Sequence, residues 1–522
     1  MQTVSSQWKE QHNNTLLNES FVEVSLNISD PLAIGVAETQ DNGAIYISDS
    51  SQIMDEVDDS PPPYCTLEQN LWCLDGNRKA LGDGDIGSNS YIGAELSDET
   101  CLFRRHPIVT IDFPQVFTKI IPGITITWSK TYGEFADTFS VIVYNGDTII
   151  AEKEITNNRS VTSLIFVDLE NYDRIDIIIK KWCLPYHRAR LEAIIVGITK
   201  VYSKGALFDY SHSQSVDPVS TSLPKNEIKF SIDNVDGEYN PYNPNGLARY
   251  LMERQEIKVR YGLKMDDSSV EWIKGGTFYL SEWYAKQNGI TADFTARDVL
   301  EFMSAVRPKE TSLPNSPRNL YTLVDTLLGE ANIPTTWVIA EELKALSTNA
   351  PLPEDTYANL LQLIANVGEC TLYQDREGVL RVAKLVNDVT DYKINLFNSY
   401  SKPEITLSKP IKEVRVKVYS YSSATESTTS EVSHNVGTEG ETITVDNPLV
   451  TDTSRAASLA SWLGTHLGHR ASLDSSWRVD VRLDALDIVK NENAYTSNKV
   501  RMTDVEFKYN GAFTGTGKGK VI

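Results

Sequence analysis

Two histidines, His466 and His469, lie three residues apart near the end of a predicted helix, where both imidazoles could reach one metal ion. A zinc-protease helix places a glutamate in a His-Glu-x-x-His frame, and this sequence has none. Basic side chains are also favourable near a helix C-terminus without any metal, because they complement the helix dipole. We therefore expect no metal site here.

Acidic residues give weak signs of other chemistry. Asp83-Gly84-Asp85 has the start of a calcium loop but lacks its glutamate at the twelfth position, so a solvated turn is favoured. Glu134 and Asp137 are close in sequence, but a glycosidase needs two carboxylates at a fixed separation, and such pairs are common on acidic surfaces. The chain has no Gly-x-Ser-x-Gly elbow, P-loop or dinucleotide-binding glycine motif. We expect no enzyme activity and no cofactor.

A sugar site is the one ligand site that the residue types favour. Aromatic faces stack on the apolar side of sugar rings, while Arg, Asn, Asp or His side chains bind the hydroxyls. Six candidate carbohydrate-binding residues lie near predicted strand ends: Trp128, Tyr132, Trp182, Tyr186, His187 and Arg188. The alternative is that Trp128 and Trp182 are core residues and Tyr186 lies in a hinge, because buried tryptophan is common in β-sandwiches.

The length and charge of the chain limit its organisation and its partners. A chain of 522 residues is too long for one hydrophobic core, so roughly three or four domains are expected. The formal net charge of −22 argues against a grip on nucleic acid and against docking on an anionic membrane. No apolar run is long enough to span a membrane, and the N-terminus lacks the apolar centre of a secretion signal.

Five cysteines without Cys-x-x-Cys spacing predict reduced thiols rather than a zinc site or a disulfide framework. They are Cys65, Cys73, Cys101, Cys183 and Cys370. The first four share one region, so one bridge among them remains an alternative.

The stretch from Asp217 to Asp298 alternates strands and turns. Residues 228–232 and 257–262 carry apolar side chains at every second position, as half-buried strands do. Asn288-Gly289 joins two further alternating runs, and an Asn-Gly pair in that position is a strong hairpin signal. This stretch therefore predicts antiparallel β structure.

Several segments of the chain together carry a family resemblance. They are Ser215-Val216-Asp217-Pro218, residues 230–241, 276–283, 294–298, 444–450 and 507–513. In this order they resemble the tail hub or tail-associated, baseplate hub-like proteins of tailed phages and prophages of Gram-positive bacteria, from about Phe21 onward. The resemblance implies a mainly β chain with a smaller α+β part: two hub-type β-barrel domains, a small mixed domain and an inserted β-sandwich.

The inserted segment, residues 64–199, shows short strands at regular spacing, with an Asn145-Gly146 hairpin, and is typical of a jelly-roll sandwich. It resembles the galactose-binding-like, discoidin-like family through Trp128-Ser129, residues 144–146 and residues 190–197. Carbohydrate binding is what this second resemblance implies.

The expected domains follow from these segments. They are an N-terminal arm (1–20), a discontinuous hub barrel (21–60 and 201–303), the sandwich (64–199), a small α+β domain (304–395) and a second barrel with a helix (404–522). Residues 55–63 are acidic and proline-rich and predict a linker. Helices are predicted from residue 320 to a stop at Gly329, from a Thr356 cap to Gly368, and over 454–469, and residues 420–433 are predicted to be a loop.

The hub resemblance implies a structural virion protein, a ring component of the tail tip or baseplate that links the tail tube to the distal adsorption apparatus. It implies a homo-oligomer, a trimer, that contacts distal tail or tube proteins, the tape measure, and fibre or receptor-binding proteins. The protein would be made in the host cytoplasm and reside at the tail tip of the virion. The alternative is a receptor-binding adhesin that recognises cell-wall glycan and is anchored by its hub-like portion.

Overall fold

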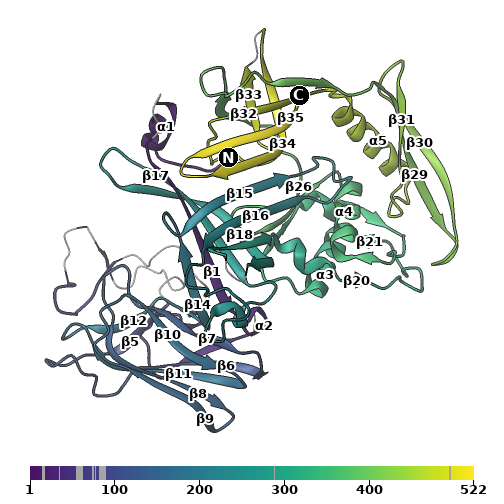
Figure 1. Ribbon diagram of the computed structural model, residues 1–522. Coiled ribbons are helices and arrows are strands. Elements are labelled where there is room, and N and C mark those ends of the chain that lie inside the picture. The colour runs from purple at the N-terminus through teal and green to yellow at the C-terminus, as the bar shows by residue number, and fades with distance from the viewer. Residues whose placement is uncertain are drawn as a thin grey trace. The chain divides into compact units, whose positions relative to one another are not determined.

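The computed structural model describes most of the chain (Figure 1). The described residues are 1–14, 18–34, 36–54, 63–72, 76, 78–80, 90–286, 289–492 and 495–522. Residues 55–62 of the predicted linker, Cys73, the predicted turn 83–85 and Asn288 of the predicted hairpin lie outside them. None of the helices described is long and apolar enough to cross a membrane.

The chain is mainly β with few helices, as the sequence predicts, and it forms two compact units. Unit 1 comprises Met1–Ser25, Val201–Asn240 and Ile257–Ile522, and unit 2 comprises Leu26–Lys200 and Pro241–Glu256. The division into barrels, mixed domain and sandwich is finer than this and stays a prediction.

Unit 2 contains two β-sheets that share one apolar core. Their strand orders are β2-β6-β11-β8-β9 and β10-β7-β13. The strands are β2 (Glu38–Asp41), β6 (Ile108–Phe117), β7 (Ile121–Thr127), β8 (Ala136–Asn145), β9 (Thr148–Ile155), β10 (Thr162–Leu169), β11 (Tyr172–Trp182) and β13 (Ala193–Ile195). Val109 and Ile177 of the larger sheet and Ile124 of the smaller one are buried in this core. Alternate residues of each strand therefore point between the sheets, which is how a sandwich buries its apolar side chains.

The chain enters unit 2 earlier than the sequence suggests. Residues 21–60 are predicted to belong to the barrel, yet β2 pairs with β6 of the sandwich, with Thr39 opposite Ile111. The pairing joins residues about seventy positions apart, and no local sequence signal specifies such a partner. A further pair, β5 (Tyr91–Leu96) with β12 (Arg188–Leu191), completes the strands around the predicted sugar site.

Unit 1 is built on one continuous sheet whose path runs β17-β18-β19-β16-β15-β34-β35-β32-β28. The bounds are β15 (Leu207–Ser215), β16 (Lys225–Asp233), β17 (Glu256–Lys264), β18 (Val270–Ala285), β19 (Thr291–Arg297), β28 (Glu404–Leu407), β32 (Ala471–Trp477), β34 (Ser497–Tyr509) and β35 (Phe513–Val521). The β15–β34 pair places His212 opposite Phe507 and so joins strands of the two predicted barrels. The strand β33 (Ile488–Glu492) branches from β34 and pairs with β27 (Val389–Ile394).

Two helices pack with a small sheet of order β22-β26-β25 in unit 1. These elements are α3 (Leu320–Ala331), α4 (Tyr357–Val367), β22 (Trp337–Ile339), β25 (Thr371–Gln374) and β26 (Leu380–Ala383). The α4 prediction is confirmed: the Thr356 hydroxyl accepts from the amide of Asn359 and caps its N-terminus, and Gly368 follows its last residue. The predicted stop of α3 at Gly329 is wrong, because the helix continues through it and ends at Asn332 in the left-handed conformation.

A second small sheet, of order β30-β29-β31, packs with helix α5. These elements are β29 (Ile411–Tyr421), β30 (Ser427–Asn435), β31 (Glu441–Val445) and α5 (Thr453–Gly468). The loop predicted over 420–433 is therefore wrong for most of its length, because β30 pairs along β29 with Ser430 opposite Val418. The sequence spacing predicts that Ala457, Ala460, Leu463 and Leu467 of α5 point inward. Ala460 and Leu463 are buried, whereas Ala457 is exposed.

The N-terminal arm is held against the rest of unit 1. Its helix α1 (Ser6–Asn13) begins at Ser5, whose hydroxyl accepts from the amide of Trp8, and the Trp8 side chain is buried. The amino group of Met1 lies 2.7 Å from Asp487, and Lys9 lies 2.6 Å from Asp391. The predicted arm is thus a docked element.

Four of the five cysteines are described, and Cys101, Cys183 and Cys370 are free thiols, as expected. Cys370 is fully buried, and burial raises the pKa of its thiol to about 11. A thiol that holds its proton at neutral pH is a poor nucleophile, so Cys370 acts as a small core residue.

Candidate functional sites

The two tryptophans among the candidate carbohydrate-binding residues are core residues. Trp128 and Trp182 are fully buried, and their rings meet edge to face with centroids 6.1 Å apart. The Trp128 indole donates to Ser163 at 2.9 Å, and the Trp182 indole donates to Glu134 at 2.8 Å. Neither ring can stack on a sugar, so this part of the site prediction is wrong.

A buried charged network lies beside Trp182 in unit 2. Glu134 accepts from Trp182 and lies 2.8 Å from Nδ1 of His187, while Glu68 binds both terminal nitrogens of Arg190. Burial opposes ionisation of Glu68, but the hydrogen bonds and charge of Arg190, together with hydrogen bonds from Arg188 and Thr66, outweigh it and lower the pKa of this carboxyl. Because each charge has a partner, the network holds the loops at this end of the sandwich together. Glu134 is therefore a buried structural carboxylate and not part of an acidic surface.

Tyr132 also belongs to this network. Arg190 lies over its ring, 4.6 Å from the centroid, and its hydroxyl accepts from the backbone amide of Tyr64 at 2.8 Å. The cavity beside it, lined also by Tyr91 and Glu192, has a volume of about 20 Å³. That is room for about one water molecule and not for a sugar ring.

The last three candidates lie in one segment but differ in access. His187 is buried against Glu134. Arg188 donates to the carbonyl oxygens of Gly93 and Ala94, which fixes its guanidinium along β5. Tyr186 is 45% exposed and has a φ of +59°, a conformation that is uncommon for residues other than glycine. Of the six predicted residues, Tyr186 offers its side chain most openly to solvent.

A second exposed aromatic side chain near this segment was missed in the sequence. Trp72 is 70% exposed, and the neighbouring residues Glu68 and Gln69 bond to the backbone of residues 186–188. The segment 66–72 and the Tyr186 segment therefore lie side by side. The signal was available, because a tryptophan outside any alternating strand pattern has no predicted core position.

The histidine pair lies where the sequence places it, with His466 in the last turn of α5 and His469 directly after it. Within the described ranges, no group of three or more His, Cys, Asp or Glu side chains is arranged to hold a metal ion. Instead, the two imidazoles line a pocket with Arg501 and Lys520.

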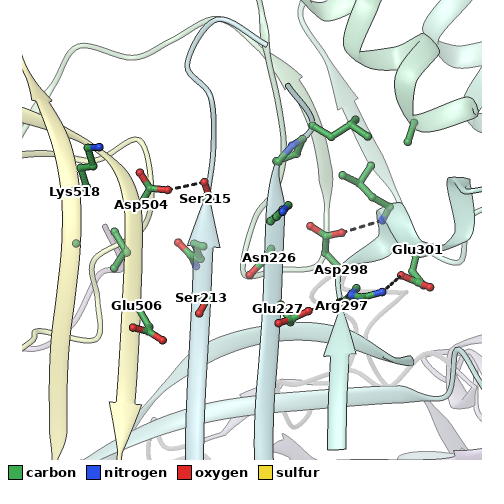
Figure 2. Close-up of a pocket in the computed structure, with 18 of the residues that line it drawn as sticks. Ser213, Ser215, Asn226, Glu227, Arg297, Asp298, Glu301, Asp504, Glu506 and Lys518 are labelled. Atoms are coloured by element: carbon green, nitrogen blue, oxygen red, sulfur yellow. Dashed lines mark hydrogen bonds and ion pairs between the residues drawn. The ribbon is translucent and has the colours of Figure 1, made fainter. Parts of the chain in front are cut away.

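A pocket of about 1010 Å³ in unit 1 opens across β35, β34, β15, β16 and β19 (Figure 2). Six carboxylates and three basic side chains line it, so its lining is acidic. The carboxylates are Glu227, Asp298, Glu301, Asp474, Asp504 and Glu506, and the basic residues are Lys225, Arg297 and Lys518. Arg297 pairs with Glu227 at 3.2 Å and with Glu301 at 3.5 Å, and these partners raise its pKa.

Asp298 differs from the other carboxylates of this pocket. Its Oδ1 accepts from the amide of Leu300 and caps the short 3-10 helix that follows β19, whereas its buried Oδ2 has no hydrogen-bond partner. Burial raises the pKa of Asp298 to about 7. A carboxyl that titrates near neutrality can carry a proton at physiological pH, and here it also has a capping role.

An exposed apolar strip runs along one end of the unit 1 sheet, between β27 and the end of β28. We define this strip by its five residues: Leu396, Phe397, Tyr400, Ile405 and Leu407. Phe397 is 99% exposed and Leu407 is 69% exposed. Among the described strands, β28 is the last of the sheet path and pairs on one side only, with β32. Exposed apolar side chains on an edge strand are typical of a surface that another chain covers.

Comparisons with known proteins give low similarities. No family model and no curated protein matches this chain. Its structure is similar to a 43 kDa tail protein of prophage MuSo2 from Shewanella oneidensis, with 12% identity over 61% of this chain and 95% of that one and a TM-score of 0.42. It is similar to the prophage tail protein gp18 from Listeria monocytogenes, with 10% identity over 62% and 91% and a TM-score of 0.39.

The lectin domain of lectinolysin, solved in complex with Lewis B antigen, is a third similar structure, with 10% identity over 31% of this chain and 94% of that domain and a TM-score of 0.20. Because each TM-score is below 0.5, neither the fold nor the function of those proteins is transferred to this chain.

Proposed function

We propose that this chain is a structural protein of a bacteriophage tail tip or baseplate, a hub-like ring component that links the tail tube to the distal adsorption apparatus. The observation that carries this proposal is the exposed apolar strip on edge strand β28. The sequence resemblance to tail hub proteins supplies the kind of assembly, and the strip supplies a surface through which a subunit could join it. The chain would act by assembly, without catalysis.

The strip favours contact with a second copy of the chain. An edge strand has unpaired backbone donors and acceptors, and natural edges are normally protected by charge, proline or cover. Ile405 and Leu407 on β28 instead present apolar side chains, and Phe397 stands fully in solvent just before it. Burying such residues at a subunit contact contributes roughly 1.5–3 kcal/mol for each large side chain. A homo-oligomer, a trimer, with other tail proteins above and below it, fits this surface.

In this proposal the protein is made in the host cytoplasm and resides in the virion at the tail tip. Its sandwich, unit 2, is an accessory module on the ring. The apolar strip belongs to unit 1, so assembly and any sugar contact would use different surfaces of the chain.

The test is the mass of the purified chain as a function of concentration, measured by sedimentation, for wild type and for Phe397→Ser with Leu407→Lys. We expect a wild-type trimer, and a variant whose dissociation constant is at least about tenfold higher, because a buried charge replaces an apolar contact. Tyr284→Ser, another exposed aromatic residue of unit 1, is the control and should assemble as wild type does. A monomer at every concentration, together with isolated peripheral copies in intact particles, would overturn the proposal.

The second candidate function is that of a receptor-binding adhesin that recognises cell-wall glycan. The observation that favours this function is the exposed side chain of Tyr186, whose backbone is in a left-handed conformation. A second exposed aromatic side chain, Trp72, lies on the adjoining segment. Side chains of this type stack on sugar rings, and uncommon backbone conformations cluster at binding sites.

The adhesin hypothesis predicts that Tyr186→Ala with Trp72→Ala reduces adsorption of particles to host cells at least about tenfold, while particles still assemble. Tyr46→Ala removes an exposed tyrosine elsewhere in unit 2 and should leave adsorption unchanged. Normal adsorption of the double variant would count against the hypothesis. Trp182 is unsuitable for this test, because truncating a fully buried tryptophan would unfold the sandwich.

A further inference from the structure

A second pocket of unit 1, about 370 Å³, is lined by four basic side chains from two strands and the end of α5. They are His466, His469, Arg501 of β34 and Lys520 of β35. Such a cluster is unexpected in a chain with a net charge of −22, in which acidic residues outnumber basic ones by 71 to 49. The question is therefore what balances the positive charge of this pocket.

Arg501 is the most constrained member of the cluster. Its side chain is 3% exposed, and its terminal nitrogens donate to the carbonyl oxygens of Val386 and Leu486 and to the amide oxygen of Asn387. All three acceptors are neutral, and the buried Nε of Arg501 has no partner. Burying a guanidinium without a counter-ion is costly, and each unbonded buried donor adds to that cost.

Two carboxylates, Asp217 and Asp504, also line the pocket, and each is held by local hydrogen bonds. Asp217 accepts from the amides of Val219 and Thr221, which closes a local turn. Asp504 accepts from the hydroxyls of Ser215 and Thr503. Within the described part of the chain, no carboxylate oxygen lies within 4.0 Å of the side-chain nitrogens of Arg501 or Lys520. Burial lowers the pKa of Arg501, and the charge of Asp487 opposes this shift without cancelling it.

The pKa values of the two histidines reflect the positive charges of Arg501 and Lys520. Burial, together with the charges of Arg501, His469 and Lys520, lowers the pKa of His466 to about 4, while Asp217 opposes them weakly. Burial, Lys520 and Arg501 lower the pKa of His469 as well. The ring of Trp462 packs edge-on against His466, 5.2 Å between centroids, and adds no charge. An anion in the pocket would oppose the part of these shifts that the positive charges cause, and would raise both pKa values.

We propose that this pocket binds a small oxyanion, held by the ammonium group of Lys520 and the two imidazoles and attracted by the buried charge of Arg501. A phosphate or carboxylate group has the size and the acceptor oxygens that these donors need, and charge-assisted hydrogen bonds of this type are the strong ones. The group could come from a free anion or from an acidic side chain of a neighbouring chain, and the pocket chemistry is the same for both. This inference is independent of the proposed structural role.

The test is a titration of the full-length chain with sodium phosphate and, separately, with sodium acetate, at constant ionic strength. Heat of binding and the histidine resonances are followed together. We expect saturable binding of at least one anion and a rise of the pKa of His466 from about 4 toward its usual 6.5. A response to phosphate alone assigns a phosphate ligand, and a response to acetate identifies a carboxylate.

Variants locate the binding in this pocket. Lys520→Ala and His469→Ala should each weaken anion binding at least about tenfold. Lys508→Ala removes the same charge from an exposed position of β34 that does not line the pocket, and it should bind as wild type does. Arg501→Met would also disturb the fold, because Arg501 holds three backbone and side-chain oxygens in place.

Two results would overturn the proposal. One is the absence of any saturable change in the His466 resonance with either anion. The other is equal weakening of binding in the Lys508→Ala control and in Lys520→Ala, which would show a general effect of net charge.

Discussion

At the scale of single residues, polar groups that the fold buries determine how unit 1 responds to pH. Asp298 is the clearest example, because one carboxyl oxygen caps a helix and the other is buried without a partner. Burial raises its pKa from the usual 3.8 to about 7. Ionisation of this buried carboxyl therefore destabilises the fold, and the destabilisation appears only as the pH rises.

The sign of the pH dependence follows from that shift. The pKa of Asp298 is higher in the folded chain than in the unfolded one, so between about pH 4 and pH 7 the folded chain holds the proton more tightly. The free energy of unfolding of unit 1 should fall as pH rises through this window. In Asp298→Asn the fall should be smaller by about 4 kcal/mol, because the amide oxygen can still accept from Leu300 and carries no charge.

Denaturant unfolding at a series of pH values measures this effect. Asp293→Asn, an exposed carboxylate on β19, is the matched control and should keep the wild-type dependence. An Asp298→Asn variant with the wild-type slope between about pH 4 and pH 7 would show that Asp298 titrates normally.

At the scale of elements, helix ends show where local signals suffice and where they do not. The sequence predicts both ends of α4 correctly, the N-terminal cap at Thr356 and the stop at Gly368, because both signals lie next to the helix in the sequence. The same kind of local signal predicts a stop of α3 at Gly329. Instead, α3 continues to Ala331, and Asn332 is the left-handed residue at its end. Asparagine tolerates that conformation, so two residues competed for one role.

Gly329→Ala gives opposite predictions for the two descriptions of α3. With Gly329 inside the helix, and no atom within 4 Å of an added Cβ, alanine should stabilise the protein by up to about 1 kcal/mol. At a left-handed helix end it would destabilise by about 1 kcal/mol or more. The free energy of unfolding measures the sign. Gly378→Ala, at a turn with φ +83°, is the control that should destabilise.

At the scale of the whole molecule, the chain has two compact units with separate cores. We expect two calorimetric transitions, because each unit buries its own apolar residues. Arg190→Met should destabilise unit 2 alone, because it leaves Glu68 buried without its counter-ion. We expect the free energy of unfolding of unit 2 to fall by roughly 3 kcal/mol, and the midpoint temperature of its transition to fall with it.

Lys180→Met is the control for the Arg190 variant. Lys180 pairs with Glu154 at 2.6 Å on the surface of the sandwich, and exposed ion pairs contribute under about 1 kcal/mol. A single transition that both variants shift equally would contradict the independence of the two units.

The sequence by itself determined the features that depend on neighbours along the chain. Alternating runs such as residues 228–232 became strands, Thr356 and Gly368 bounded a helix, and the lack of paired cysteine spacing agreed with free thiols. These signals work because side-chain periodicity and caps act over a few residues.

Only the tertiary structure decided what depends on residues far apart. It placed Trp128 and Trp182 in the core, paired β2 with the sandwich, and brought Arg376 within 2.6 Å of Asp484. It also gathered His466, His469, Arg501 and Lys520 around one pocket, of which the sequence showed the histidine pair alone. The reason is physical: burial and charge partners are set by non-local packing, which local spacing does not encode.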